Sequence, residues 1–259
     1  MLFPLAVLLS TTIVELAPSS NWVVNYADDS CIAQRAFGPS DAQQTLGFQQ
    51  LPLSRLTDII VISDKMDLSR PNQSKLTISA AALPPKQFGF ESNSSRQTGR
   101  GIMKFTIGAK DMDLITQSGD FLVQIKNAKL HFAVGRLDKV MQALNHCTQQ
   151  LLAEWHVDQS EVDRIKEWPT PKADSGAAID LLLRNVKNGD ADVRVPLLLA
   201  ISEQGHVTEC RVLDPRVPAQ SAKQLCDALI ASGRFEPARD AQGRAIAAHT
   251  IQGVRWSYH

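Results

Sequence analysis

The chain lacks most of the residue patterns that bind metals or phosphate groups. Its four cysteines include no C-x-x-C pair, and its six histidines show neither an H-x-x-H nor an H-E-x-x-H spacing. Glycine-rich phosphate loops and the G-x-S-x-G motif of α/β-hydrolases are missing as well. These absences predict a protein with no metal, no cofactor and no catalytic residues, and hence not an enzyme.

Excess charge and aromatic residues are also scarce. The 27 basic residues balance the 27 acidic ones, and Lys and Arg form no cluster. Because neutralisation of phosphates dominates nucleic-acid binding, this composition predicts no nucleic-acid partner. Aromatic residues make up only 6% of the chain. A binding face is therefore expected to be small or to depend on main-chain contacts.

No apolar run is long enough for a stable membrane span. The run from Leu2 to Val14 contains a proline and is followed by Glu15, so as a helix it would cover roughly 20 Å of about 30 Å of hydrocarbon. Its length suits the core of a secretory signal, and Ala17-Pro18-Ser19 offers small residues to a signal peptidase. We therefore expect a signal peptide over residues 1–20, cleaved after Ser19 or Ser20. An uncleaved N-terminus that anchors the chain in a membrane is the alternative.

The four cysteines fit an exported protein with disulfide bonds. Three pairings are possible. We favour Cys210 with Cys226 and Cys31 with Cys147, because each bridge then stays inside one predicted domain. Four buried free thiols in a cytosolic protein are the alternative.

The region before residue 135 alternates short β-prone segments with turn residues, which predicts a mainly-β domain, a sandwich or barrel-like fold. The polar stretch from Glu91 to Arg100 is expected to be a surface loop. Asp111-Met112-Asp113 is expected on a solvated strand edge. The predicted strands are Trp22 to Tyr26, Cys31 to Phe37, Leu56 to Ile62, Leu76 to Ala80, Gly101 to Ile107, Phe121 to Ile125 and Leu130 to Val134.

Apolar residues at helical spacing from Leu137 to Trp155 predict a long helix that closes this domain, with Cys147 on its buried side. Two prolines in Trp168-Pro169-Thr170-Pro171-Lys172 predict an extended linker. We therefore expect a first domain over residues 21–158, a linker over 159–175 and a second domain over 176–259. A short helix from Ile179 to Val186 would open the second domain.

The last part of the chain predicts a three-stranded antiparallel sheet with helices. Residues from Val193 to Ile201 alternate like a half-buried strand, Glu203-Gln204-Gly205 forms a turn, and His206 to Leu213 is a second strand. Helical spacing from Ala222 to Ile230 ends at Gly233. The final strand runs from Ala247 to Tyr258, and together these elements make the predicted fold class α+β.

Spaced residues in this module resemble the C-terminal domain of TonB-family energy transducers. The resemblance covers residues from about 176 to the end of the chain. The segment around Trp22 to Tyr26 resembles the start of uncharacterised periplasmic domains that are fused to TonB-like modules. The residues that carry the first resemblance are Gly205-x-Val207, Cys210-x-Val212, the helix with Cys226, Arg234-Phe235-x-Pro237-Ala238-x-Asp240, Gly243 and Val254-x-Trp256.

The resemblance implies a non-enzymatic periplasmic protein that binds a partner peptide or protein by β-strand addition. The implied partner is a segment of an outer-membrane receptor, and the implied process is energy-dependent transport across that membrane. The expected docking residues are Thr250, Gln252, Val254 and Trp256 on the last strand. Side chains that belong simply to the core are the alternative reading of this face.

The sequence also departs from the family pattern. A working transducer needs an inner-membrane helix and a long proline-rich spacer, and neither is recognisable here. A periplasmic hydrolase or ligand-binding β-domain with a TonB-like appendage is therefore the alternative function. An exposed sheet edge also allows a homodimer formed by strand exchange.

Overall fold

A computed structural model describes residues 13–27, 29–50, 52–63, 75–94, 100–125, 128–172 and 191–258. The chain divides into two compact units. The first unit contains Met1–Tyr26, Cys31–Gln50 and Arg55–Asn145, and the second contains Ala27–Ser30, Leu51–Ser54 and His146–His259. The predicted short helix from Ile179 to Val186 lies outside the described residues.

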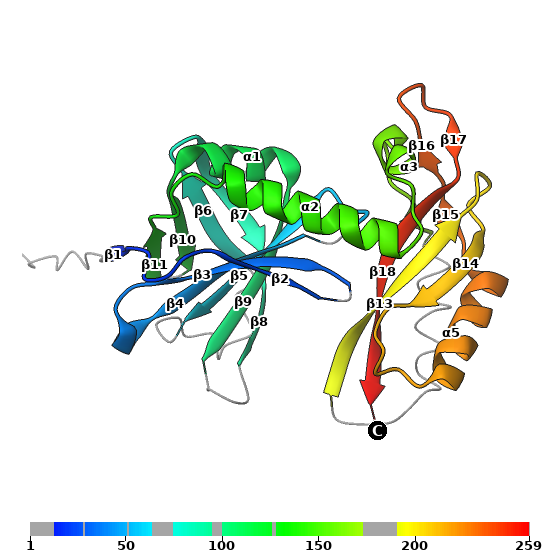
Figure 1. Cartoon of the computed structure of the whole chain (residues 1–259), viewed down its shortest axis with the longest axis horizontal. Helices are drawn as coiled ribbons and strands as arrows, with labels where there is room; N and C mark the ends of the chain where they lie inside the picture. Colours follow the sequence, from blue (N-terminus) through cyan, green and yellow to red (C-terminus); the bar gives the residue numbers. More distant parts are fainter. Residues whose placement is uncertain are drawn as a thin grey trace, which may run out of the picture. The chain divides into compact units, whose positions relative to one another are not determined.

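The predicted α+β class is wrong, because the protein is mostly β, with 48% strand against 25% helix. The described residues form several sheets and only short helices (Figure 1). The error came from strands that were not predicted. These strands are β1 (Ile13–Leu16), β4 (Gln44–Gln50), β7 (Leu83–Gly89), β8 (Glu91–Ser94) and the short pairs of the second unit.

Two sheets form the first unit. The five-stranded sheet has the order β1-β11-β10-β6-β7, and the six-stranded sheet has the order β2-β3-β4-β5-β9-β8. Only β1 and β11 pair in parallel; the other pairs in these two sheets are antiparallel. The remaining strands are β2 (Val23–Tyr26), β3 (Cys31–Phe37), β5 (Leu56–Ser63), β6 (Lys75–Ala80), β9 (Gly101–Gly108), β10 (Phe121–Ile125) and β11 (Ala128–Phe132).

Phenylalanine rings join the two sheets. Phe37 on β3 meets Phe132 on β11 edge to face, with 5.2 Å between the ring centroids. Phe105 on β9 stacks on Phe121 of β10 at 6.4 Å. Each of these rings is at most 2% exposed. Because the rings come from both sheets, the sheets pack face to face as a sandwich.

Residues 13–20 belong to the fold of the first unit. Leu16 on β1 is only 2% exposed. The N–H of Gly38 donates to the carbonyl of Ala17 at 2.8 Å, and the N–H of Ser19 donates to the carbonyl of Ala36 at 2.9 Å. Cleavage after Ser19 or Ser20, as the sequence suggested, would therefore remove a strand of the five-stranded sheet. The apolar residues at this position suit a strand as well as a signal core.

The imidazole of His131 on β11 holds β1 in place. Its Nδ1 lies 2.5 Å from a carboxylate oxygen of Glu15, its register partner on β1, and its Nε2 lies 3.1 Å from Asp120. Burial lowers the pKa of His131, but the hydrogen bonds and charges of the two carboxylates outweigh burial, so the pKa is raised above 6.5. The contacts of His131 with Glu15 and Asp120, called the His131 contact below, are therefore strongest when the ring carries its second proton.

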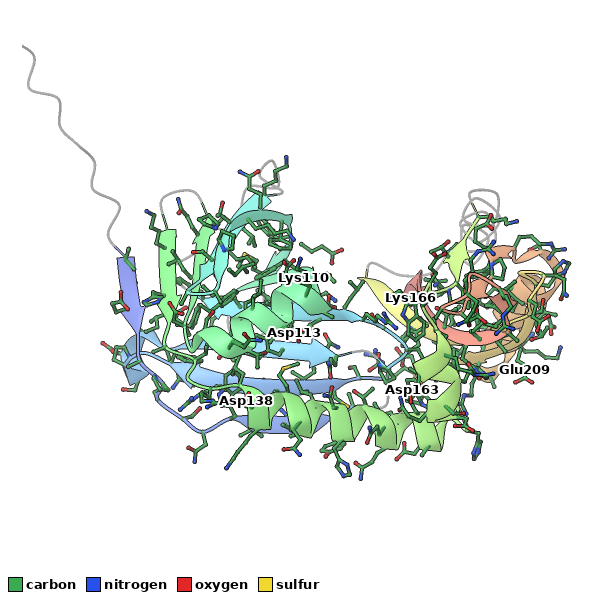
Figure 2. All side chains as sticks on the ribbon, turned by 90° about the horizontal axis from the view of Figure 1, so that it is seen from above. Lys110, Asp113, Asp138, Asp163, Lys166 and Glu209 are labelled. Atoms are coloured by element: carbon green, nitrogen blue, oxygen red, sulfur yellow. A yellow bond between two sulfur atoms is a disulfide. The ribbon has the colours of Figure 1, made fainter. Side chains whose placement is uncertain are left out.

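The segment Asp111-Met112-Asp113 lies in helix α1 (Ala109–Ser118), and its predicted place on a strand edge is wrong (Figure 2). Met112 and Ile115 are buried at helical spacing, and Gly119 ends the helix in the left-handed conformation. Asp111 pairs with Lys86 at 2.6 Å. Two residues apart on a helix, the two carboxylates point in different directions and cannot share a cation.

Two of the unpredicted strands are sheet edges with unusual sequences. β7 contains Pro84 and Pro85, residues more typical of turns than of strands. Both prolines lie opposite the irregular step in the β6–β7 register between Ile78 and Ala80, and no described strand pairs with the other side of β7. Their missing N–H groups therefore fall outside a regular ladder. Glu91 to Ser94, expected in a loop, forms β8 at the edge of the six-stranded sheet.

Helix α2 (Asp138–Glu154) occupies the predicted position. Its acidic first residue suits the positive end of the helix dipole. Its apolar stripe is buried, with Leu144 and Cys147 at 0% exposure. The boundary between the two units falls within this helix.

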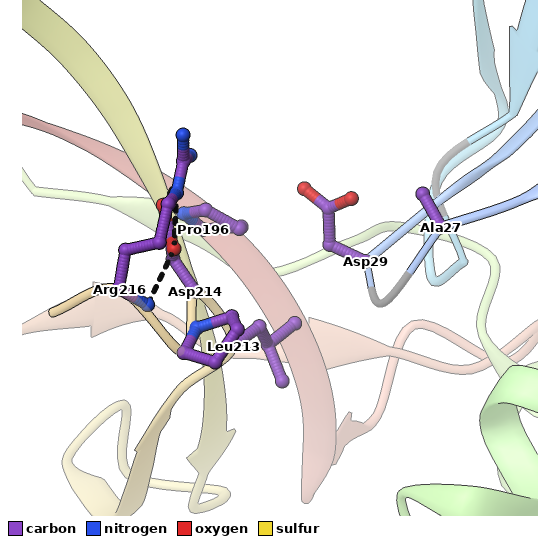
Figure 3. Close-up of a pocket in the computed structure, with 7 residues that line it drawn as sticks. Ala27, Asp29, Pro196, Leu213, Asp214 and Arg216 are labelled. Atoms are coloured by element: carbon purple, nitrogen blue, oxygen red, sulfur yellow. Dashed lines mark hydrogen bonds and ion pairs between the residues drawn. The ribbon is translucent and has the colours of Figure 1, made fainter.

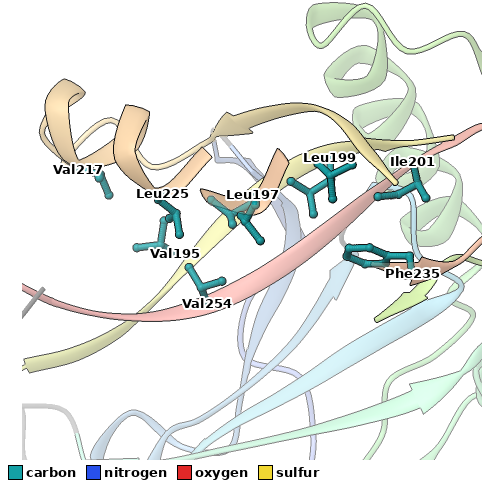
Figure 4. Close-up of a cluster of buried hydrophobic side chains, with 10 residues drawn as sticks. Val195, Leu197, Leu199, Ile201, Val217, Leu225, Phe235 and Val254 are labelled. Atoms are coloured by element: carbon teal, nitrogen blue, oxygen red, sulfur yellow. The ribbon is translucent and has the colours of Figure 1, made fainter. Parts of the chain in front are cut away.

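The main sheet of the second unit is antiparallel with the order β14-β13-β18. Its strands are β13 (Ala191–Ile201), β14 (Val207–Val212) and β18 (Ala248–Tyr258), and helix α5 (Ala219–Ser232) covers one face. Alternate residues of β13 point into a core that includes Leu225, Phe235 and Val254 (Figure 4). Each such buried side chain stabilises the fold by about 1.5–3 kcal/mol.

Most of the predicted linker packs within the second unit. Helix α3 (Gln159–Arg164) is followed by Ile165, which is 1% exposed and packs with Ala238 and Ala248. The short strand β12 (Thr170–Pro171) pairs with β15 (Phe235–Glu236). The prolines exclude helix, as expected, but an extended segment is also suited to strand pairing. A second short pair joins β16 (Ala238–Arg239) to β17 (Ala245–Ile246).

We predict opposite sensitivities for two glycines of the second unit. Both are left-handed, with φ +80° at Gly205 and +75° at Gly243. A Cβ on Gly205 would lie 1.9 Å from the carbonyl oxygen of Phe235, whereas one on Gly243 would meet nothing within 4 Å. Gly243→Ala should cost about 1 kcal/mol of unfolding free energy for the left-handed backbone alone. Gly205→Ala should cost several-fold more in urea unfolding, and equal losses would contradict this account.

We also predict that the hold on β1 weakens as pH rises. A raised pKa means that the stabilisation is complete below 6.5, the ordinary value, and is lost as pH rises through the value in the folded protein. The urea midpoint of the first unit should therefore fall modestly on going from about pH 6 to about pH 9. His131→Gln should remove this component, whereas the exposed control His146→Gln should keep it. If the urea midpoint of His131→Gln kept the pH dependence of the wild type, the His131 contact would not be its cause.

Candidate docking edge

No metal-binding cluster is found where the structure describes the chain. Within the described ranges, no three side chains of His, Cys, Asp or Glu are placed to hold a metal ion. No described helix combines the length and the apolar composition needed to cross a membrane.

A shallow pocket of the second unit is lined in part by Pro196, Leu213 and Asp214 (Figure 3). The carboxylate of Asp214 accepts hydrogen bonds from the main-chain N–H, Nε and terminal nitrogen of Arg216, at 2.9, 2.9 and 2.7 Å. The carboxylate of Asp214 is thus paired within its own loop. Such an arrangement is typical of a structural turn.

All four cysteines are oxidised. Cys210 on β14 and Cys226 on α5 are joined by a disulfide with 5.3 Å between their Cα atoms. This bridge fastens the helix to the sheet that it covers. Cys31 and Cys147 are disulfide-bonded as well. A disulfide-linked chain fits an oxidising compartment.

The strongest candidate is β18, which is an edge of its sheet. Among the described residues, β18 pairs with β13 on one side and with no strand on the other. An edge strand presents a row of main-chain N–H and C=O groups to any chain that can pair with it. Successive residues of β18 direct their main-chain groups alternately toward β13 and away from it, and this alternation is called the phase of the ladder below. The phase decides which residues carry the outward groups.

Two hydrogen bonds determine that phase. The N–H of His249 on β18 donates to the side chain of Glu161, so it points away from β13. The carbonyl of Pro196 accepts from Leu213, so the main chain of Pro196 faces the β14 side of the central strand. In an antiparallel ladder, hydrogen-bonded and non-hydrogen-bonded pairs alternate. The two bonds give the same result. The pairs Pro196–Gly253 and Ala200–His249 are both non-hydrogen-bonded pairs of the β13–β18 ladder.

The outward main-chain groups therefore belong to Ile251, Gly253, Arg255 and Ser257. The residues expected to dock a partner, Thr250, Gln252, Val254 and Trp256, instead direct their main-chain groups to β13. The side chains of Thr250 and Val254 are buried, at 4% and 5% exposure. Sequence periodicity identified the face of the strand but could not identify which main-chain groups are unpaired.

No protein-family model, curated protein or solved structure matches this chain. Nothing in these comparisons indicates a TonB C-terminal domain, so that resemblance stays a prediction. The candidate site depends instead on the geometry of the edge.

Glu161 is the one charged group placed by a described contact on the outward edge of β18. Its carboxylate is 17% exposed and lies 3.0 and 3.1 Å from Nδ1 of His249. Burial of Glu161 raises its pKa, but the hydrogen bonds from the ring and the N–H of His249 have the larger combined effect, so the pKa is lowered. The carboxylate is therefore ionised at neutral pH.

We predict that proline is tolerated at one position of β18 and not at the next. Gln252→Pro removes an N–H that donates to β13, which should cost about 1–3 kcal/mol for the lost ladder hydrogen bond alone. Gly253→Pro removes only an outward N–H, and the free energy of unfolding should change by about 1 kcal/mol or less. Urea unfolding of the full chain measures both variants. A larger loss for Gly253→Pro would reverse the assigned phase.

Proposed function

We propose that this chain is a non-enzymatic binding protein that captures an extended segment of a partner protein by strand addition to β18. The observation that carries the proposal is the outward direction of the main-chain groups of Ile251 and Gly253 on a sheet edge. A peptide that pairs with such alternating groups obtains its affinity from main-chain hydrogen bonds. This mode suits a protein with few aromatic residues.

The composition of the edge supports docking. Natural proteins protect exposed edges with proline, lysine or a covering segment. β7 follows this rule with Pro84, Pro85 and Lys86. β18, with the sequence AHTIQGVRWSY, has neither proline nor lysine. An edge of this length without such protection is suited to a partner strand.

The proposal places the protein in the periplasm. The disulfide between Cys210 and Cys226 requires an oxidising compartment to persist. The resemblance described above implies a receptor segment of the outer membrane as the partner. Coupling to an energy source at the inner membrane stays a prediction of that resemblance alone.

The proposal can be tested with a defined probe. The probe is a short peptide of alternating valine and threonine, N-methylated along one edge so that it can pair through the other edge only. We expect binding to the full chain, with slower amide hydrogen exchange at Ile251 and Gly253. Gly253→Pro should abolish binding because it removes a central outward donor.

Ala241→Pro is the matched control. Ala241 is exposed in the turn from Asp240 to Gly243, at a position that accepts proline. This variant should bind the probe as the wild type does. Failure of the wild type to protect Ile251 and Gly253 at saturating probe would overturn the proposed function.

A further inference from the structure

One carboxylate occupies the first donor of the docking edge. The N–H of His249 donates to Oε1 of Glu161 at 2.6 Å, and the ring of the same histidine lies within 3.1 Å of both carboxylate oxygens. Glu161 thus holds the main chain and the side chain of one residue, 88 positions away in sequence. This contact is called the Glu161 cap below.

The Glu161 cap is held by the surrounding fold. Asp158 begins α3 by accepting from the N–H of Ser160 at 2.8 Å. Immediately after the helix, the N–H groups of Lys166 and Glu167 donate to the carbonyl of Arg239 at 2.8 and 3.1 Å. Ile165 is buried against Ala238 and Ala248, so the rest of the unit fastens the chain directly after α3, while the Asp158 cap defines where the helix starts.

The position of the cap has a consequence for any strand that docks. A strand that pairs with β18 uses the outward groups of every second residue, which are His249, Ile251, Gly253, Arg255 and Ser257. At His249 the donor already has a charged acceptor, and α3 supplies the covering segment. Hydrogen bonds to a charged group are stronger than those between neutral groups. An incoming carbonyl is therefore excluded from His249.

We propose that the Glu161 cap is a stop that sets the register of the bound strand, so that pairing starts at Ile251 and runs toward the end of β18. The bound-strand part of this inference rests on the proposed function, whereas the cap itself does not. An edge without a stop allows a partner to slip by two residues at a time, because the side-chain period of a strand is two. The cap thus gives the edge a defined beginning.

The first experiment needs no ligand. Amide hydrogen exchange of the full chain, followed by NMR, should show slow exchange at His249 and fast exchange at Ile251 and Gly253. Glu161→Ala should raise the exchange rate of His249 by about tenfold or more, since it removes a charge-assisted hydrogen bond. Glu161→Gln, which keeps an acceptor oxygen, should retain most of the protection.

Asp163→Ala is the matched control, because Asp163 is an exposed carboxylate on the same helix (Figure 2). It should leave the exchange of His249 unchanged. Equal exchange rates for His249 in Glu161→Ala and the wild type would overturn the cap. In the wild type alone, exchange at Ile251 as slow as at His249 would show a covered edge and would overturn the stop, because pairing could then not start at Ile251.

The second experiment measures register with the N-methylated valine–threonine probe carrying a spin label at one end. In the wild type, line broadening should be centred on the Ile251 end of the edge. In Glu161→Ala, the probe should shift by two residues and newly slow the exchange of His249. Binding in an unchanged register would overturn the stop. Absence of binding in every variant would overturn the proposed function and the register, whereas the exchange result for the cap would stand.

Discussion

The ladder between β13 and β18 is the constraint on which the second unit depends. It pairs Ala191 with Tyr258 at one end and Ile201 with Ala248 at the other. Because a main-chain group that is buried without a partner costs free energy comparable to a lost hydrogen bond, every residue of β18 that bonds to β13 is committed to that direction. The residues between them are then necessarily turned outward. The alternation of hydrogen-bonded and non-hydrogen-bonded pairs between β13 and β18 therefore determines both the docking edge and the position of the stop.

The same rule explains how the protein treats two of its other edges. β7 carries two prolines and a lysine, and β8 is a short polar strand. Both make the edge a poor template for a further strand. On β18 the protection is confined to His249, where α3 reaches the edge, and it ends before Ile251. β18 therefore differs from β7 and β8 in that only one of its ends is protected against pairing.

Long-range polar contacts hold the ends of elements that packing alone would leave weak. β1 has four residues and a single neighbouring strand, and the His131 ring fastens it through Glu15. The helix that carries Glu161 has six residues and no buried residue of its own. An isolated helix of that length is not stable in water. It persists because the segment after it is paired with Arg239 and buried at Ile165.

Local pattern predicted many elements well. The strands from Cys31 to Phe37 and from Phe121 to Ile125 have the expected bounds, and the turn at Gly205, the helix around Cys226 and the final strand are in their expected places. Three of the missed strands share one cause. β7 with its prolines, β8 with its polar residues and the segment 170–171 are strands only because another strand lies beside them. The prediction that Asp111 and Asp113 lie on a strand edge is wrong for a different reason: this segment forms the short helix α1, whose buried Met112 and Ile115 show helical spacing.

The amino-acid sequence by itself determined the period of each long element, the side chains that would be buried and the chemistry of four cysteines. Only the tertiary structure decided which main-chain groups of β18 are left without a strand partner and which carboxylate occupies the first of them. The physical reason is that side-chain alternation depends on the strand alone. The direction of a hydrogen bond depends on where the neighbouring strand ends, and the Glu161 cap joins residues 88 positions apart.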